Sequence, residues 1–195
     1  DLLAWIKMHA GVECVITAAD IAGINCYGVI PPFADQPALA EKTTRYRGEP
    51  VALVVGDPKA LEALGLDDFS ISWTPRPHSL TQADGAGPDA TLLHVHRQEN
   101  TLIRGNVVSG APDSAMFEAA HVVIGQFETS YVEHAYIEPE AEVAWMEADV
   151  LCIQACTQAP VMDLEDTAKV LGLPLNKVRI IPSAAGGGFG AKLDV

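Results

Sequence analysis

The sequence predicts an α+β fold, because short apolar strands and amphipathic helices follow one another along its 195 residues and no repeat is evident. Residues 150–156 form an apolar run typical of a strand. Thr157 is suited to cap the helix that follows. The apolar side chains of that helix recur every three or four residues, at Val161, Leu164, Ala168 and Leu171. Residues 177–181 then predict a strand before a glycine-rich tail.

The N-terminal part of the chain predicts a further set of elements. Residues 1–9 have one apolar face and predict a helix, which Gly11 is placed to end. Residues 12–17 predict a strand. The continuous apolar run over residues 50–55 predicts another strand, of the kind that is buried on both faces.

A helix is predicted between this strand and the next. Asp57 and Pro58 are a typical helix start, with an N-cap followed by proline at the first helical position. The helix would cover residues 59–64, and the alternating residues 68–74 would form the following strand. Strand, helix and strand together predict one small α/β unit.

A linker follows, because residues 75–88 are rich in proline, glycine, serine, threonine and aspartate. We place a first domain at residues 1–80, the linker at residues 81–110 and a second domain at residues 111–195. The second domain begins with a predicted helix over residues 111–120.

Strands are also predicted inside the second domain. Alternating residues indicate a long strand over residues 122–132. Its candidate core side chains are Val122, Ile124, Phe127 and Tyr131. Residues 141–146 predict a further strand, joined to the strand at residues 150–156 by a turn at Ala148 and Asp149.

The charge balance limits the partners of the chain. The net charge is −14 and the sequence pI is about 4.6, which argues against nucleic acid because phosphate binding needs clustered lysine and arginine. No apolar run approaches the length of a bilayer span and no signal peptide is evident, so we expect no membrane partner and a cytoplasmic location. The chain starts without methionine, which leads us to expect a piece of a longer protein.

The cysteines and histidines do not predict a metal site. The four cysteines are Cys14, Cys26, Cys152 and Cys156. They lack Cys-x-x-Cys and iron–sulfur spacings, so Cys152 and Cys156 are expected to be buried free thiols in a reducing compartment. His94 and His96 could bind a metal as a pair, but no third ligand has a suitable spacing, and a surface or packing role is more common.

The glycine-rich tail predicts an anion site. Glycine can adopt positive φ and lie against a ligand, and successive N–H groups can converge on oxygen atoms. Phe189 is the one large side chain among its four glycines, and Lys192 is the nearest cation. The tail lacks the spacing of a P-loop or a dinucleotide site. From the tail alone, a flexible hinge is an equal alternative, and without its anion we expect the tail to be mobile.

Four stretches of the chain together carry a resemblance to a known family. They are residues 15–21 (VITAADI), 45–55 (RYRGEPVALVV), 133–140 (EHAYIEPE), and 157–192 from Thr157-Gln158 to Gly186-Gly187-Gly188-Phe189-Gly190-Ala191-Lys192. In order and spacing they resemble the molybdenum-binding large subunit of the xanthine dehydrogenase and aldehyde oxidase family, the molybdenum hydroxylases. The resemblance covers nearly the whole chain.

The resemblance implies an architecture and a function. Residues 1–80 would be an α/β hammerhead domain that lacks its N-terminal part, and residues 111–195 would begin a molybdopterin cofactor-binding domain. The full enzyme would oxidise an aldehyde or N-heteroaromatic substrate with oxygen from water, whereas the isolated fragment would be inactive. Its cofactor would be molybdenum-molybdopterin, with the cytosine dinucleotide as one form, and electrons would pass to Fe-S and FAD centres on other domains or subunits. A non-catalytic shortened module that binds a partner or the cofactor is the alternative.

The resemblance also implies site residues. Gln158 matches the glutamine that hydrogen-bonds an oxygen ligand of molybdenum, and Phe189 matches the phenylalanine that lines the substrate pocket, so these two are the implied catalytic residues. With them, Gly187, Gly188 and Gly190 match the loop that approaches the cofactor. Without the resemblance, Gln158 would be interpreted as a solvent-facing residue at a helix start.

Two further expectations depend on the family pattern. Relatives that hydroxylate xanthine have a glutamate directly after the lysine, where this chain has Leu193 in the substrate pocket, so an aldehyde or a less polar heteroaromatic is expected. The family's catalytic glutamate matches no residue here, so neither Glu133 nor Glu138 is assigned as a base. His134 and Glu138 are expected to be buried, hydrogen-bonded partners near the cofactor.

Overall fold

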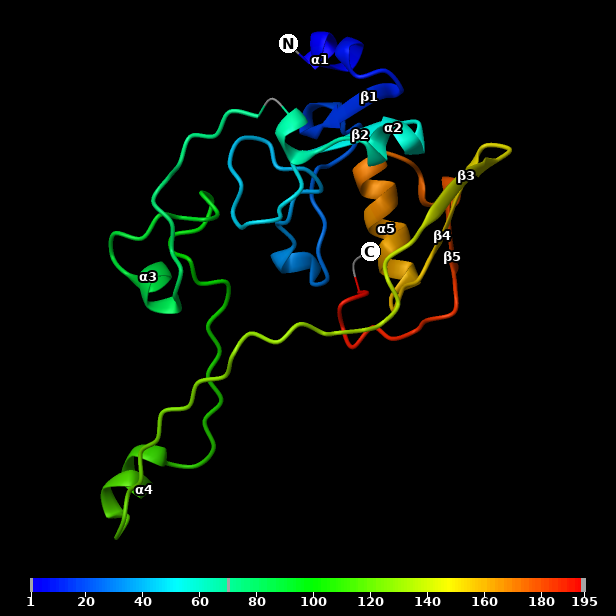
Figure 1. The fold of residues 1–195 in the computed structure, drawn as a ribbon. Coiled ribbons are helices and arrows are strands. Elements are labelled where there is room, and N and C mark those ends of the chain that lie inside the picture. The colour runs from blue at the N-terminus through cyan, green and yellow to red at the C-terminus, as the bar shows by residue number, and fades with distance from the viewer. Residues whose placement is uncertain (1, 70, 194–195) are drawn as a thin grey trace. The chain divides into compact units, whose positions relative to one another are not determined.

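The computed structural model describes residues 2–69 and 71–193, which contain both helices and strands, as an α+β fold requires (Figure 1). The chain divides into two compact units. Unit 1 comprises Asp1–Thr74 and His134–Val195, and unit 2 comprises Pro75–Glu133. Among the described residues, no helix is long and apolar enough to span a bilayer.

Unit 1 contains a two-stranded sheet from the N-terminal part of the chain. Its elements are α1 (Leu2–Met8), β1 (Val12–Thr17), β2 (Ala52–Gly56) and α2 (Pro58–Glu62). β1 and β2 pair antiparallel. Asp57 caps α2 by accepting hydrogen bonds from the amides of Lys59 and Ala60, at 3.0 and 3.2 Å. The helix and strand predictions up to this point of the chain are confirmed.

Two predictions about this region are wrong. β2 is not buried on both faces, since Leu53 and Val55 are exposed. Leu53 and Val55 alternate along β2, so they share one exposed face of the strand. Among the described strands, β1 and β2 pair only with each other. Residues 68–74 form no strand in their described part, where a 3-10 helix (Leu66–Asp68) is followed by irregular chain. Alternation does not make a strand unless a neighbouring edge satisfies its backbone hydrogen bonds.

A three-stranded sheet forms the second part of unit 1. Its elements are β3 (Val143–Glu147), β4 (Val150–Ala155), α5 (Pro160–Leu171), a 3-10 helix (Leu175–Lys177) and β5 (Val178–Pro182). The strand order is β3-β4-β5, with β3 and β4 antiparallel and β4 and β5 parallel (Figure 1). Ala155 lies opposite Pro182, so the carboxyl ends of β4 and β5 reach the same edge of the sheet. All three strands and the helix were predicted.

The buried face of α5 differs from the predicted one. Ala168 is buried as expected, but Val161 and Leu171 are exposed and Asp163 is buried. The hydroxyl of Thr157 donates to Asp163 and accepts from the backbone amide two residues further on at 2.9 Å. The N-cap of α5 is Ala159 and has no side-chain cap, so the prediction that Thr157 caps this helix is wrong. Thr157 instead contacts Asp163, which is buried.

The segment after β1 packs closely against the C-terminal end of α5. The amides of Gly23 and Ile24 donate to the carbonyls of Val170 and Lys169, both at 3.0 Å. A Cβ atom at Gly23 would lie 2.0 Å from the Lys169 carbonyl oxygen, so this approach requires glycine. The contact ties the N-terminal part of unit 1 to the helix of its second sheet.

Unit 2 contains α3 (Gln82–Ala86) and α4 (Pro112–Glu118), and it includes the whole of the predicted linker at residues 81–110. α4 confirms a predicted helix. The strand predicted over residues 122–132 is wrong, because no residue there is in a strand. Its predicted core side chains, Val122, Ile124, Phe127 and Tyr131, are all exposed. Apolar residues without a paired edge, such as Phe127 at 94% exposure, cannot form a half-buried strand.

Candidate functional site

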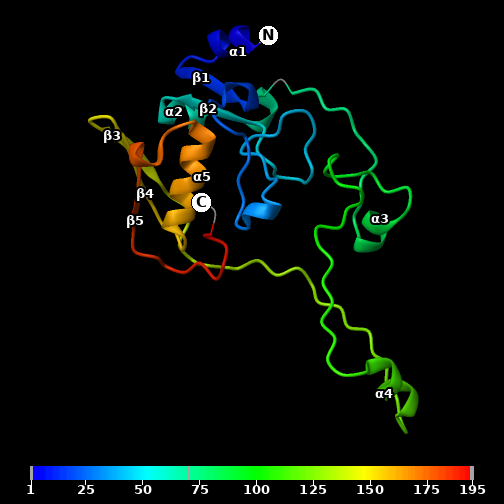
Figure 2. The ribbon, with the colours of Figure 1, turned by 180° about the vertical axis from the view of Figure 1, so that it is seen from behind.

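The candidate site lies where the two parallel strands end. Gln158 follows β4 by three residues, and the glycine loop, defined here as residues 186–192, follows β5. The amide of Ser183 donates to the carbonyl of Ala155 at 2.8 Å, which keeps the two chain segments together beyond the sheet. Figures 1 and 2 show the C-terminal segment passing the N-terminal end of α5.

Gln158 holds the C-terminal half of the glycine loop. Its Oε1 atom accepts hydrogen bonds from the amides of Gly190 and Lys192, at 2.9 and 3.3 Å. Its own backbone amide donates to the carbonyl of Lys192 at 2.7 Å. The loop contacts only the oxygen end of the side chain. The Nε2 amino group has no hydrogen-bond partner within the described part of the chain.

Close contacts and backbone conformation explain why two positions of the loop require glycine. A Cβ atom at Gly188 would lie 2.4 Å from Oε1 of Gln158. Gly187 has a φ of 124°, which side-chain-bearing residues rarely adopt. Phe189 also has a positive φ, of 54°, at a cost of about 1–2 kcal/mol for a residue with a Cβ atom. Such strain is typically retained at functional positions.

Three consecutive amides of the loop have no protein acceptor among the described residues. They belong to Gly187, Gly188 and Phe189. Gly188 is buried, and buried N–H groups are rarely left without a partner. Together with Nε2 of Gln158 they offer neutral donors to oxygen atoms. This donor set fits an oxygen-rich, anionic cofactor.

An ion pair between a buried lysine and a half-buried glutamate anchors the loop on a second segment. The side chain of Lys192 is 0% exposed, and its Nζ atom lies 3.0 Å from Oε2 of Glu138, whose side chain is 27% exposed. The same oxygen accepts hydrogen bonds from the thiol of Cys156 at 2.9 Å and from the amide of Gly186 at 2.7 Å. One carboxylate oxygen thus meets both ends of the glycine loop.

Two more groups surround the ammonium of Lys192. Its Nζ atom lies 3.6 Å from Oε2 of Glu140 and 4.5 Å from the centroid of the Tyr136 ring. The Tyr136 hydroxyl donates to Glu140 at 2.5 Å, which orients both side chains. A buried ammonium stabilised by two carboxylates and an aromatic face has little need of a further anion.

These contacts shift the pKa values of both charged groups. Hydrogen bonds from Cys156, Gly186 and Lys192 lower the pKa of Glu138 from 4.5 to about 2. Burial alone would lower the pKa of Lys192, but hydrogen bonds with Glu138 and Cys156 outweigh it and raise that pKa above its ordinary value. Glu138 is therefore a poor general base, in agreement with its assignment as a structural partner.

The remaining sequence predictions have mixed outcomes. Cys152 and Cys156 are buried free thiols, as predicted. Glu138 is hydrogen-bonded but only half-buried, and His134 is exposed, so the prediction of two buried partners is wrong. His134 belongs to an irregular segment with no sheet or helix to cover it.

The exposure of the two predicted substrate-pocket residues differs. Phe189 is 73% exposed, and Leu193 is half-buried. Lys192 anchors the loop, whereas the sequence indicated only a cation near the ligand. Two glutamates separated by one proline, at Glu138 and Glu140, were the available signal for a buried cationic partner.

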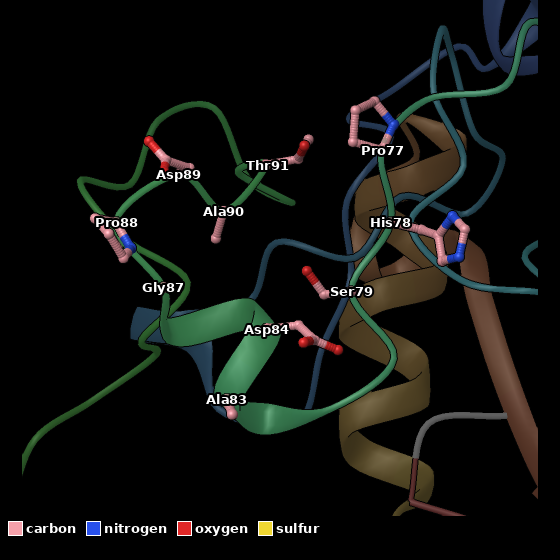
Figure 3. A pocket seen from close by; sticks show the side chains of 10 residues that line it. All are labelled: Pro77, His78, Ser79, Ala83, Asp84, Gly87, Pro88, Asp89, Ala90 and Thr91. Atoms are coloured by element: carbon pink, nitrogen blue, oxygen red, sulfur yellow. The ribbon is translucent and has the colours of Figure 1, made fainter.

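Unit 2 contains a pocket of about 350 Å³, lined by residues 77–79, 83–84 and 87–91 (Figure 3). None of the predicted cofactor residues lines it. Two carboxylates line it, those of Asp89 and Asp84. Asp84 accepts hydrogen bonds from the side chain and backbone of Thr81, and these lower the pKa of Asp84. Because this carboxylate is engaged in capping α3, we do not assign a site here.

Comparison with known proteins identifies the family. Residues 93–195 match the model of the molybdopterin cofactor-binding domain. This range includes Gln158, the glycine loop and the carboxylates that hold Lys192. The chain belongs to the family of molybdopterin cofactor-binding domains of molybdenum hydroxylases.

Individual relatives agree with this assignment. The chain is 32% identical over 190 residues to the nicotinate dehydrogenase large molybdopterin subunit of Eubacterium barkeri, covering 95% of this chain and 43% of that protein. It is 28% identical over 185 residues to the xanthine dehydrogenase of Dictyostelium discoideum, covering 93% of this chain and 13% of that protein. The chain therefore spans less than half the length of these relatives.

Solved structures show the same fold. The aldehyde oxidoreductase from Desulfovibrio gigas superposes with a TM-score of 0.81 at 24% identity, over 98% of this chain and 22% of that chain. The quinoline 2-oxidoreductase from Pseudomonas putida 86 superposes with a TM-score of 0.75 at 26% identity, over 100% of this chain and 26% of that chain.

Proposed function

We propose that this chain supplies one wall of the cofactor and substrate site of a molybdenum hydroxylase. The observation that carries the proposal is the run of three amides without an acceptor among the described residues, at Gly187, Gly188 and Phe189, beside the uncommitted Nε2 group of Gln158. Neutral donors stabilise the oxygen atoms of an anionic cofactor without adding charge. Relatives named for nicotinate and quinoline support an N-heteroaromatic substrate, and a probable aldehyde oxidase among the relatives supports an aldehyde.

Several residues of this chain would have distinct roles in the complete enzyme. The molybdenum-molybdopterin cofactor, when bound, supplies the redox chemistry of an oxidation that takes its oxygen from water. Gln158 would donate from Nε2 to an oxygen atom of the bound cofactor, while its Oε1 atom holds the loop. The amides of Gly187 and Gly188 would hold oxygen atoms of the cofactor, and Gly190 keeps the loop on Gln158. Phe189 orients the substrate from its constrained backbone.

The proposal extends to parts of the enzyme outside the glycine loop. We assign residues 1–80 to a hammerhead domain, residues 81–110 to a linker and residues 111–195 to the cofactor-binding domain. Fe-S and FAD centres on other domains or subunits accept the electrons, in the cytoplasm. The cofactor is molybdenum-molybdopterin, with the cytosine dinucleotide as one form, and the isolated chain is inactive because none of its residues is assigned as the base.

The molybdenum and pterin content of the native full-length complex, purified from its own host, tests the proposal. We expect stoichiometric molybdenum and turnover of aldehydes or N-heteroaromatics. A complex that carries no molybdenum contradicts the proposal. Bound cofactor without turnover of any substrate favours the non-catalytic module instead.

A further inference from the structure

We infer that Lys192 and Glu138 form a latch that holds the glycine loop in its donor-presenting shape before the cofactor binds. Both are then positioning residues, which act on the cofactor through the loop. The consequence for cofactor binding rests on the proposed function, whereas the latch itself is a property of the chain.

The loop needs contacts that hold its shape, because glycine loses more conformational freedom on ordering than any other residue. The contacts that order it converge on two oxygen atoms. Oε2 of Glu138 meets the amide of Gly186 and the ammonium of Lys192, at 2.7 and 3.0 Å. Oε1 of Gln158 meets the amides of Gly190 and Lys192. The two oxygens fasten the loop at both ends, and the amides of residues 187–189 between them have no acceptor in the described part of the protein.

Burial makes the latch costly to open. The side chain of Lys192 is fully buried, so removing Glu138 would leave an ammonium without its closest counter-ion inside the protein. Glu140 and the Tyr136 ring add weaker attraction on the same side. The ammonium is thus committed to the segment 136–140 and is not the group that receives an anionic ligand.

Hydrogen exchange at the loop amides tests the latch in the cofactor-free, full-length protein. We expect Glu138→Gln and Lys192→Met each to accelerate exchange over residues 186–192 about tenfold or more. The double variant should exchange no faster than the worse single variant, because the two residues act as one unit. Lys177→Met is the matched control, since it breaks the half-exposed pair with Asp149 and should leave loop exchange unchanged.

Molybdenum content provides the second readout. We expect about tenfold less molybdenum in both latch variants and wild-type content in Lys177→Met. Unchanged loop exchange in both latch variants overturns the inference, and so does faster exchange with undiminished molybdenum. If Lys192→Met does not fold, Glu138→Gln decides alone, because it keeps the size of the side chain and removes only the charge that pairs with the ammonium. A wild-type protein without molybdenum rejects the proposed function, but the exchange rates still decide whether the latch exists.

Discussion

At the scale of single residues, Gln158 has a side chain whose two ends serve different partners. Its oxygen is occupied by the amides of Gly190 and Lys192, while its nitrogen has no partner in the described structure. A carboxylate could provide the first contact but not the second. An amide is therefore the side chain that both holds the loop and offers a donor to a ligand.

Gln158→Glu separates these two roles. Glutamate keeps the acceptor for the loop, removes the donor and adds a negative charge, so we expect a folded protein whose turnover in the full complex falls about 100-fold or more. Steady-state kinetics and thermal unfolding measure the two effects. Gln154→Glu is the control, because Gln154 is an exposed residue of β4 outside the loop. Near wild-type turnover in Gln158→Glu would contradict the donor role.

At the scale of elements, the segment 136–140 and the glycine loop depend on the charge of one carboxylate. The folded-state pKa of Glu138, about 2, is below its ordinary value of 4.5. Its contribution to stability is therefore complete above pH 4.5 and is lost as the pH falls through 2. Acid thus opens the contact between these two segments.

Acid unfolding of wild type and Glu138→Gln, monitored by circular dichroism, measures this contribution. We expect the stability of the wild type to fall more steeply between pH 4.5 and 2 than that of the variant, because the variant has no proton to bind at this position. Other carboxylates titrate in both proteins and cancel in the difference. Parallel curves would show that the charge of Glu138 is unimportant.

The contact between α5 and the segment after β1 is a second property of elements. Gly23→Ala would place a Cβ atom 2.0 Å from a helix carbonyl and push the segment away. We expect a loss of about 2–4 kcal/mol in the free energy of unfolding, from overpacking and broken hydrogen bonds. Thermal or urea unfolding measures it. Gly105→Ala, where a Cβ atom meets nothing within 4 Å, should be close to wild type.

At the scale of the whole molecule, the proposed substrate preference rests on Leu193, which follows Lys192 in the sequence and offers an apolar side chain. Leu193→Glu in the full complex should raise kcat/KM for xanthine relative to an aldehyde by about tenfold or more, because a carboxylate can pair with a polar heterocycle. Leu193→Gln controls for polarity without charge. Fast turnover of xanthine by the wild type would contradict the proposed preference.

The sequence by itself determined most elements and predicted part of the candidate site. The cap at Asp57, the turn at Ala148 and the strand–helix–strand order of β4, α5 and β5 follow from signals within a few residues of each element. The family motif placed Gln158 and the glycine loop in one site. Such signals are local, or are carried by a motif, so they can be recognised without the chain path.

Only the tertiary structure decided which segments pair. The strand predicted over residues 122–132 has no partner edge among the described strands, and β2 is open on one side. Glu138 and Lys192, 54 residues apart, meet inside unit 1 and order the loop that glycine alone would leave free. The physical reason is that hydrogen bonds and ion pairs between distant segments depend on which segments the fold brings together. No local sequence pattern encodes this.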